Sequence, residues 1–237
     1  MEKKLPHKLV PQMEVLGEFP PNVQDQVADL AKRREYKKGD ILFHAGQIWP
    51  FVFYVYDGML RSVISSLDAQ EYTVSTWGEG EVFWSHSLLD GEPMPSTMEA
   101  LKEATVYLWP GELMMDFLLA HPPAARALLR RQTQLIRARR STIHNLAFSS
   151  VTGRLAKFIL KSFDSTRSNT ISRELTLDEM ASIVSTSPVV VCRVLHQLQA
   201  EGVLKISRST ISLSDWNALE RIAQEGEKLH ELTDTPD

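Results

Sequence analysis

"STSPVVVCRVLHQL", residues Ser185–Leu198, decides how the second half of the chain folds. Three consecutive valines and a cysteine suggest a buried strand, yet a strand here would mix polar and apolar side chains on both faces. Helical spacing at i, i+3, i+4 and i+7 instead gathers the apolar residues Val191, Val194, Leu195 and Leu198. Ser187 can cap such a helix, and Pro188 suits its first turn. The sequence therefore predicts a helix over about residues 187–199.

The opposite face of this helix points to nucleic acid. With the apolar stripe turned inward, Val189, Arg193 and His196 face outward. Val189 and Arg193 are one turn apart near the amino-terminal end, where a recognition helix meets base edges in the major groove. This pattern favours DNA reading over a solvated helix with one stray valine.

The flanking segments complete a small α+β unit. "TLDEMASIV" begins with Thr176 and has Glu179 three residues later, a capping box that starts a helix. Gly202 is placed to end the valine-rich helix. "VLKISRSTISLSD" then alternates apolar and polar residues around Arg208-Ser209, as a hairpin does. Helix, turn, helix and hairpin in this order predict a winged helix-turn-helix domain.

The first half of the chain has the pattern of antiparallel β-structure. Between residues 34 and 110, apolar runs such as "DILFHAGQ" and "FVFYVYDGMLRSVIS" are separated by turn residues. Glycines stand where the turns are expected, at Gly39, Gly46, Gly58 and Gly80. The pattern predicts a barrel or sandwich of short hairpins, preceded by one or two helices over residues 14–33.

Residues 111–147 have the pattern of a long helix with a start or kink at Pro122-Pro123. Beyond the prolines, a stripe recurs at a spacing near 3.5 residues: Ala125, Leu128, Leu129, Gln132, Leu135, Ile136, Arg139, Ile143 and Leu146. A helix of about 25 residues extends roughly 37 Å, more than a small barrel can cover. A coiled-coil seam uses such a length, so the sequence predicts a homodimer through residues 124–147.

The net charge of −4 conceals an uneven distribution. Residues 117–163 carry nine basic residues and no acidic ones, whereas acidic residues outnumber basic ones on both sides of this stretch. A basic stretch of this kind steers an anionic partner even when the whole protein is acidic.

Composition disfavours several classes of protein. The one cysteine, Cys192, leaves no disulfide framework within the chain. No apolar run approaches the roughly 18–20 residues of a membrane span, and the N-terminus lacks the apolar core of a secretory signal. Walker A, GxSxG, HExxH and CxxC motifs are absent. We therefore expect a cytoplasmic protein that is not an enzyme and does not bind a membrane.

Taken in order, these motifs resemble the CRP/FNR family of bacterial transcription regulators over about residues 20–216. "NLAFSSVTGRLA" (Asn145–Ala156) resembles the hinge that precedes the DNA-binding domain of the catabolite activator. "GDILFHAGQ", "YVYDGMLRSV" and "GEGEVFW" resemble the cyclic-nucleotide-binding barrel, and "LTLDEMASIVSTSPVVVCRVLHQLQAEGVLKIS" resembles the helix-turn-helix.

The resemblance implies an α+β fold with a jelly-roll, cupin-like antiparallel β-barrel, a long dimerisation helix and a winged helix-turn-helix. The expected parts are the effector-sensing barrel at 14–116, the central helix at 117–147, the DNA-binding domain at 148–219, and a terminal helix and tail at 220–237. The family also implies a homodimer on a pseudo-palindromic site in double-stranded DNA, controlled by a small-molecule effector. RNA polymerase is a possible further partner.

Three departures from the family argue against cAMP as the effector. Where cyclic-nucleotide binders carry Gly-Glu for the ribose hydroxyl, this chain has Trp84-Ser85. Where they hold the cyclic phosphate with Arg-Ser, it has Pro95-Ser96, so the compensating cation is missing. Where two hydroxyl residues of the central helix touch the adenine, it has Arg139-Arg140.

The effector itself stays open among four alternatives. One is haem, because His86 in "FWSHS" matches the axial histidine of the carbon-monoxide-sensing member, with an apolar wall from Phe83, Trp84 and Met94. Another is a small carboxylate on Arg139 or Arg140, as in relatives that sense 2-oxo acids. The others are an apolar or aromatic ligand, and no ligand at all. The candidate effector residues are Trp84, Ser85, His86, Ser96, Arg139 and Arg140; His86 is the sole candidate metal ligand, through haem.

The reading helix also departs from the family. Its second and third positions usually carry Arg and Glu, with Arg four residues after the Glu; this chain has Pro188, Val189 and Arg193. Arg193 can bond guanine O6 and N7, whereas Val189 can only pack, most usefully on a thymine methyl. Further polar residues can reach phosphates. The DNA-binding candidates are Thr186, Ser187, Val189, Arg193, His196 and Arg208.

Two functions follow, an effector-controlled DNA-binding regulator or a ligand-binding or interaction module whose helix-turn-helix no longer reads specific DNA. Residues 164–216 hold five basic residues against six acidic ones. Phosphate neutralisation is therefore expected to depend on dimerisation and on Arg154, Lys157 and Lys161.

Overall fold

The structure is a computed structural model that describes residues 4–66, 71–166, 168–172 and 174–228. The described residues divide into two compact units, one of residues 4–66 and 73–136 and the other of residues 71–72, 137–166, 168–172 and 174–228.

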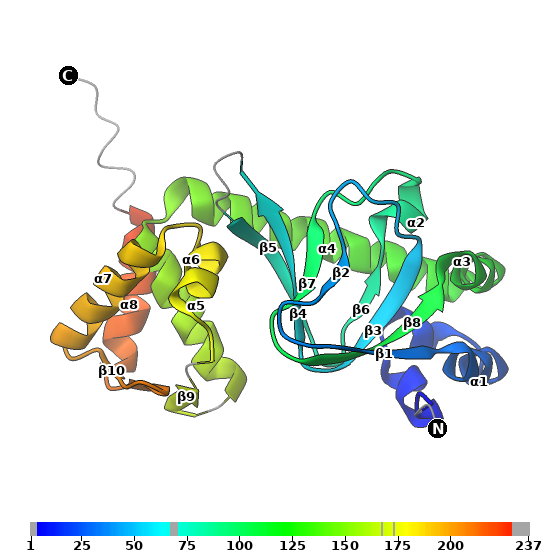
Figure 1. Cartoon of the computed structure of the whole chain (residues 1–237), viewed down its shortest axis with the longest axis horizontal. Helices are drawn as coiled ribbons and strands as arrows, with labels where there is room; N and C mark the ends of the chain where they lie inside the picture. Colours follow the sequence, from blue (N-terminus) through cyan, green and yellow to red (C-terminus); the bar gives the residue numbers. More distant parts are fainter. Residues whose placement is uncertain (1–3, 67–70, 167, 173, 229–237) are drawn as a thin grey trace, which may run out of the picture. The chain divides into compact units, whose positions relative to one another are not determined.

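The first unit is a β-sandwich with helices packed on one of its sheets (Figure 1). In the described residues its strands are β1 (Lys32–Tyr36), β2 (Ile41–Phe43), β3 (Phe51–Asp57), β4 (Met59–Ser65), β5 (Glu71–Gly78), β6 (Val82–Trp84), β7 (Thr97–Ala100) and β8 (Ala104–Pro110). One sheet has the order β1-β8-β3-β6, and the other has the order β2-β7-β4-β5. The β1–β8, β3–β8, β3–β6, β2–β7 and β4–β7 ladders are antiparallel, so the predicted jelly-roll is confirmed.

Five buried aromatic side chains of the described residues lie in the core between the sheets. The cluster contains Phe43, Trp49, Phe53, Trp77 and Phe83, packed with methionines and aliphatic residues. Ring centroids lie 4.6 Å apart for Phe43 and Trp49, and 4.8 Å apart for Phe53 and Phe83. Offset and edge-to-face pairs at such distances add to the stabilisation from burial alone.

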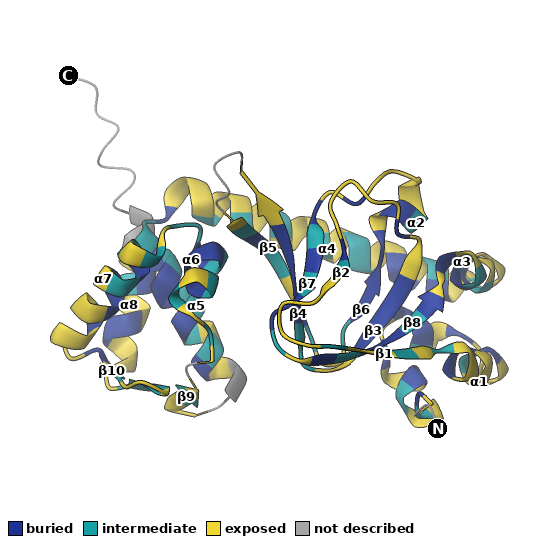
Figure 2. Cartoon of the chain, viewed as in Figure 1, coloured by how far each residue is buried: buried dark blue, intermediate teal, exposed yellow. Residues whose placement is uncertain are grey.

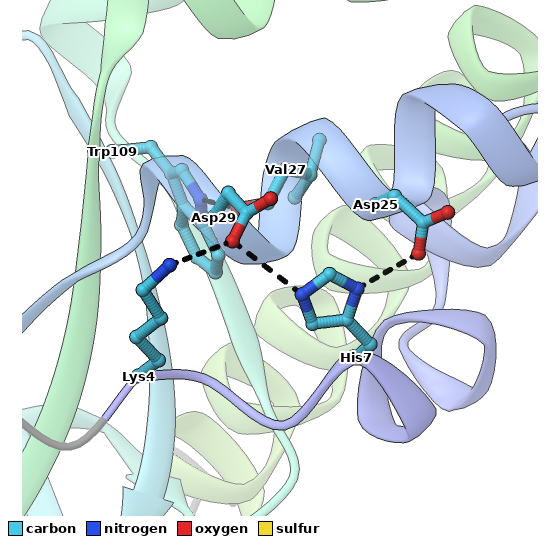
Figure 3. Close-up of polar contacts among 6 residues, drawn as sticks. All are labelled: Lys4, His7, Asp25, Val27, Asp29 and Trp109. Atoms are coloured by element: carbon cyan, nitrogen blue, oxygen red, sulfur yellow. Dashed lines mark hydrogen bonds and ion pairs between the residues drawn. The ribbon is translucent and has the colours of Figure 1, made fainter.

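The other face of the first sheet is covered by helices. These are the 3₁₀ helices η1 (His7–Gln12) and η2 (Val15–Glu18), and the α-helices α1 (Pro21–Leu30), α3 (Gly111–Ala120) and the start of α4 (Pro122–Phe148). The indole Nε1 of Trp109 donates to the carbonyl of Val27 at 2.7 Å, which fixes α1 to β8 (Figure 3). The short helix α2 (His86–Asp90) follows β6.

Polar contacts hold the N-terminal segment on α1. His7 Nδ1 lies 2.8 Å from Asp25 Oδ1, and its Nε2 lies 3.5 Å from Asp29 Oδ1 (Figure 3). Lys4 Nζ donates to the same Asp29 oxygen at 3.1 Å. One imidazole therefore bridges two carboxylates on successive turns of α1.

The turn glycines behave as predicted. Gly39, Gly46, Gly58 and Gly80 all have positive φ, between 80° and 89°. At Gly58 a Cβ atom would also lie 2.0 Å from the carbonyl oxygen of Glu103, so only glycine fits this β3–β4 turn.

The predicted central helix is wrong at its start. Residues 117–120 belong to α3, His121 leaves the helical conformation with φ −130° and ψ 87°, and α4 begins at Pro122. The two prolines cannot continue the preceding helix, because they lack the N–H that an interior turn needs. The central helix thus runs from Pro122 to Phe148.

The apolar stripe predicted for α4 is divided between two faces of the helix. Ala124, Ala127 and Leu128 are buried in the core beneath the first sheet. Leu129, Ile136 and Ile143 are 69%, 69% and 67% exposed. Their spacing of seven residues returns them to one side of the helix.

The second unit is a helical domain with a small sheet. Its described elements are α5 (Val151–Thr166), β9 (Thr170–Ser172), α6 (Leu177–Val184), α7 (Pro188–Ala200), β10 (Leu204–Ile206), β11 (Thr210–Leu213) and α8 (Trp216–Lys228). The sheet has the order β10-β11-β9, and β10 and β11 form the predicted hairpin. Leu219 and Ala223 of α8 are buried in the same core as α5. The domain boundary expected at 219/220 therefore falls within α8, which is part of the second unit.

The helix ends confirm most of the predicted caps. Thr176 and Glu179 form both bonds of the capping box at the start of α6. Gly202 follows α7 with φ 74°. Ser187 stands at the cap position of α7, but its side chain makes no capping bond, which corrects the role expected for it.

Candidate functional site

Helix α7 presents two distinct faces, as Figure 2 shows. Its inner stripe is buried as predicted: Val191, Val194, Leu195 and Leu198 are each at most 4% exposed. On the outer face, Val189 is 77% exposed, and Arg193 and His196 are exposed as well. The helix therefore offers a methyl-bearing side chain and a guanidinium one turn apart.

The turn before α7 is shaped by a left-handed residue. Ser185 has φ 55° and ψ 64°, a conformation that costs a non-glycine residue roughly 1–2 kcal/mol. Thr186 follows, half-buried, and its N–H donates to the Ala181 carbonyl at 3.0 Å. The hydroxyl of Ser187 is exposed beside the start of α7. The N–H groups at the start of such a helix can donate hydrogen bonds to phosphate oxygens.

A pocket of about 270 Å³ separates α7 from the wing. It is lined by Leu177, Cys192, Leu195, His196, Gln199, Ile206, Ser207 and Arg208. The Sγ atom of Cys192 lies 3.9 Å from His196 Nε2, on the next turn of the same helix. Arg208 is exposed at the tip of the wing, where Ser207 Oγ accepts from the N–H groups of Ser209 and Thr210. His196 and Arg208 thus line one depression from two elements, a suitable position for backbone contacts.

Arg154 is engaged within its own unit, which corrects the phosphate-neutralising role expected for it. Its guanidinium donates to the carbonyl of Val184 at 2.8 Å and to that of Ser185 at 3.1 Å. It donates to the Ser149 carbonyl at 2.6 Å as well. Burial lowers the pKa of the Arg154 guanidinium from its usual value. Arginine geometry suits this task, because a planar fork can serve several acceptors at once.

Lys157 is likewise engaged, whereas Lys161 is not buried. Lys157 Nζ donates to Asn145 Oδ1 at 2.9 Å and to Ser149 Oγ at 3.3 Å. Lys161 is exposed on α5. Of the three cations expected to face phosphates from this helix, two therefore fasten the segment between α4 and α5.

Trp84 and Ser85, two of the candidate effector residues, have structural roles. Trp84 is buried in the core beneath the helices rather than between the sheets. Ser85 is fully buried, and its Oγ accepts from the Leu88 N–H at 3.3 Å as the cap of α2. Neither presents a carboxylate or a free amide where a ribose hydroxyl would need one.

Ser96 is buried between neighbouring strands. Its Oγ lies 2.6 Å from Ser62 Oγ, so each hydroxyl has the other as partner. The adjacent Pro95 is exposed and brings no positive charge. Where the family has an arginine beside this serine, Pro95 supplies no positive charge, so burying a cyclic phosphate here would lack that compensation.

The wall expected around a haem at His86 does not form. Phe83 and Met94 belong to the core between the sheets, while Trp84 belongs to the core beneath the helices. Consecutive residues of a strand point to opposite faces, which places Phe83 and Trp84 in different cores rather than in one wall. His86 itself is exposed at the first position of α2, with its ring centroid 6.1 Å from that of Phe83.

Arg139 and Arg140 lie on the part of α4 that belongs to the second unit. Arg139 is half-buried, and burial lowers the pKa of its guanidinium from the usual value. Arg140 is exposed. Adjacent residues of a helix point about 100° apart, so the two side chains do not form a single fork.

One pocket of the first unit escaped the sequence analysis. It has about 250 Å³ and is lined by Lys32, Arg34, Tyr36, Trp49, Phe51, Leu108, Trp109 and Pro110. The signal lay in "KRREY", an edge strand in which Lys32 and Arg34 share one face. Periodicity alone does not say which face of such a strand is inward.

Two family models match the chain, one in each unit. A model of the cyclic nucleotide-binding domain matches residues 33–121, and a model of the Crp-like helix-turn-helix domain matches residues 153–222. The chain belongs to the CRP/FNR family of transcription regulators. Both matches cover the elements described above, the sandwich with α3 and the helices from α5 to α8.

Individual relatives agree with this membership of the CRP/FNR family. The cyclic AMP receptor protein of Thermus thermophilus is 26% identical over 203 residues, which cover 86% of this chain and 93% of the relative. The transcriptional activator protein FnrA of Stutzerimonas stutzeri is 26% identical over 210 residues, 82% of each chain. This CRP/FNR chain is a DNA-binding transcription regulator.

Solved structures share the fold. FixK2 from Bradyrhizobium japonicum matches with a TM-score of 0.70 at 20% identity, over 81% of this chain and 96% of that one. A CooA mutant from Carboxydothermus hydrogenoformans also reaches 0.70, at 19% identity over 84% and 90%. No helix in the described part of this CRP/FNR chain combines the length and the apolar character of a membrane span.

Proposed function

We propose that the protein is a homodimeric regulator whose two copies of α7 read an inverted repeat, with Val189 and Arg193 as the base-contacting residues. The exposed pair Val189 and Arg193 on α7 carries this proposal. The apolar residues between Val190 and Leu198 are all buried or half-buried, so they are not available to DNA. Arg193 selects guanine through its bidentate fork, and Val189 favours a thymine methyl. Thr186, Ser187, His196 and Arg208 contact the phosphate backbone.

The exposed seam of α4 supports the homodimer. Leu129, Ile136 and Ile143 repeat every seven residues and are each about two-thirds exposed. Exposed apolar side chains at a heptad spacing are the mark of a coiled-coil partner, and a second copy supplies the same seam. Dimerisation also sets the distance between two half-sites, one helical turn of DNA or a multiple of it.

The effector of this regulator is a molecule other than cAMP. The aromatic packing between the sheets and the lack of a cation at Pro95-Ser96 support this. The division of Phe83 and Trp84 between two cores counts against haem at His86. A small carboxylate on Arg139 or Arg140, an apolar or aromatic ligand, and regulation without a ligand remain compatible with the structure. The protein acts in the cytoplasm, has no catalytic activity, and contacts RNA polymerase at the promoter.

Selection of random DNA duplexes by the purified protein tests the function. The expected result is an enriched inverted repeat with guanine and thymine at the steps facing Arg193 and Val189. Absence of enrichment with every added effector would favour the second candidate, a ligand-binding or interaction module. Val189 and Pro188 favour that candidate, because neither can hydrogen-bond a base.

A further inference from the structure

The inner face of β1 carries charge where a sandwich normally carries apolar residues. Lys32 pairs with Leu108 across the β1–β8 ladder, and Arg34 pairs with Val106. Val106 is fully buried between the sheets, and Leu108 packs against the same cluster. Residues directly opposite each other lie on the same face of a sheet, so Lys32 and Arg34 point to the inner side.

The charged residues on the opposite face of β1 contact one another and β8. Arg33 donates to Thr105 Oγ1 at 3.4 Å and forms an ion pair with Glu35. Both residues fall on the register of Tyr107, which faces the helices. Lys32 and Arg34 are both exposed on the inner register of the same strand, and Arg34 Nη1 donates to the carbonyl of Arg33 at 3.0 Å.

These two cations line the pocket of about 250 Å³ together with aromatic side chains. Trp49 and Phe51 are 5.1 Å apart between ring centroids, and Tyr36 and Trp109 line the pocket too. No acidic side chain contributes to the lining. Asp40, the acid that acts on Tyr36, accepts instead from the Lys37 N–H at 2.8 Å.

The charge of the Arg34 guanidinium affects the hydroxyl of Tyr36 in the pocket. Burial raises the pKa of the Tyr36 hydroxyl, and the positive charge of Arg34 opposes that rise. Trp49 connects the pocket to the core between the sheets, because its ring also packs on Phe43 at 4.6 Å. A molecule seated on Trp49 therefore contacts a side chain that belongs to the core between the sheets.

We propose that this pocket binds a small planar aromatic carboxylate, with its ring on Trp49 and Phe51 and its carboxylate between Lys32 and Arg34. An apolar cavity of about 150 Å³ is enough for benzene, so this pocket has room for a ring and one anionic group. Guanidinium and ammonium groups give charge-assisted bonds to a carboxylate. The proposal adds a ligand class to the effector-controlled regulator proposed above and rests on that function for its biological meaning.

A protective role of the two cations makes a different prediction. Charged residues that point inward on an edge strand also discourage pairing with another chain. In that case, their removal promotes self-association and leaves affinity for aromatic acids unchanged.

Titration calorimetry on the full-length protein without DNA tests the binding, with benzoate as the probe and benzamide as its neutral match. We expect benzoate to bind at least about tenfold more tightly than benzamide, a difference of one charge-assisted contact. The double variant Lys32→Met/Arg34→Met should abolish this preference. Lys37→Met, just beyond β1 and outside the pocket lining, should keep it.

Equal affinities for the two probes, or a benzoate preference that survives in the double variant, would overturn the proposal. Thermal unfolding of each variant checks that the sandwich is intact. Trp49→Phe keeps an aromatic ring in the pocket lining and should retain benzoate binding. Since DNA is absent, failure here leaves operator reading untouched, and failure of the duplex selection leaves this site untouched.

Discussion

At the scale of single residues, the unusual valine of the reading helix is the most exposed of the large apolar side chains in the described part of the chain. Val189 is 77% exposed at the amino-terminal end of α7, one turn from Arg193. Helical periodicity was sufficient to predict this, because the four inward positions fix every outward one. Arg154 shows the limit of such reasoning. Its charge is visible in the sequence, but its three carbonyl acceptors come from segments that only folding brings together.

Arg193→Ala should relax the preference for one base pair in each half-site. A bidentate arginine–guanine contact discriminates against the wrong base by about 1–3 kcal/mol. Competition binding with duplexes altered at single positions measures this. A uniform loss of affinity for all sequences would mean that Arg193 contacts phosphate alone. Arg221→Ala, exposed on α8, is the matched control.

His7 should make stability depend on pH. Its hydrogen bond to Asp25 raises the pKa of the imidazole, and the charge of Asp29 adds to the rise. Because the folded-state pKa is raised, the stabilisation is complete below the unfolded value of about 6.5 and is lost as pH rises through the folded pKa. The Tm difference between the wild type and His7→Gln should therefore be largest in mildly acid buffer and shrink toward alkaline pH. A difference that grows with pH would contradict this assignment.

At the scale of elements, the sequence predicted the order of strands and helices but not which side of a helix meets its own chain. The stripe on α4 was read as one seam, yet Leu128 is buried in the first unit and Leu129 is exposed. Both faces are apolar, so periodicity cannot separate packing within the chain from packing with a partner. The two prolines predict the location of the break at Pro122, but not whether the helix kinks or starts there, because a proline suits either.

Arg154→Ala should destabilise the second unit by about 2 kcal/mol, because three carbonyls lose a charged donor. Arg154→Lys should recover part of the loss, since an ammonium cannot span all three acceptors. Denaturant unfolding followed by far-ultraviolet circular dichroism measures both variants. Lys161→Ala, on the same helix and exposed, should leave stability nearly unchanged. If Arg154→Ala and Lys161→Ala behave alike, the contacts of Arg154 contribute nothing.

At the scale of the whole molecule, the dimer seam is the feature that the single chain leaves open. Ile136→Lys should shift the protein from dimer to monomer, because it places a charge in the middle of an apolar interface. Leu119→Lys is a close control, since Leu119 is 72% exposed on α3, compared with 69% for Ile136 on α4. Sedimentation equilibrium distinguishes the two states. Dissociation by both variants, or by neither, would refute the seam.

The hydrogen bonds of Arg154 and Lys157 within the chain have a consequence for nonspecific binding to chromosomal DNA. Cations that fasten the chain are not available to displace the counterions condensed on DNA, so affinity for arbitrary sequences should be low and its salt slope shallow. A regulator of this kind spends little time sliding on unrelated DNA, and few of its molecules are bound to nonspecific sites in the genome. Its operators then respond directly to how many molecules the cell contains.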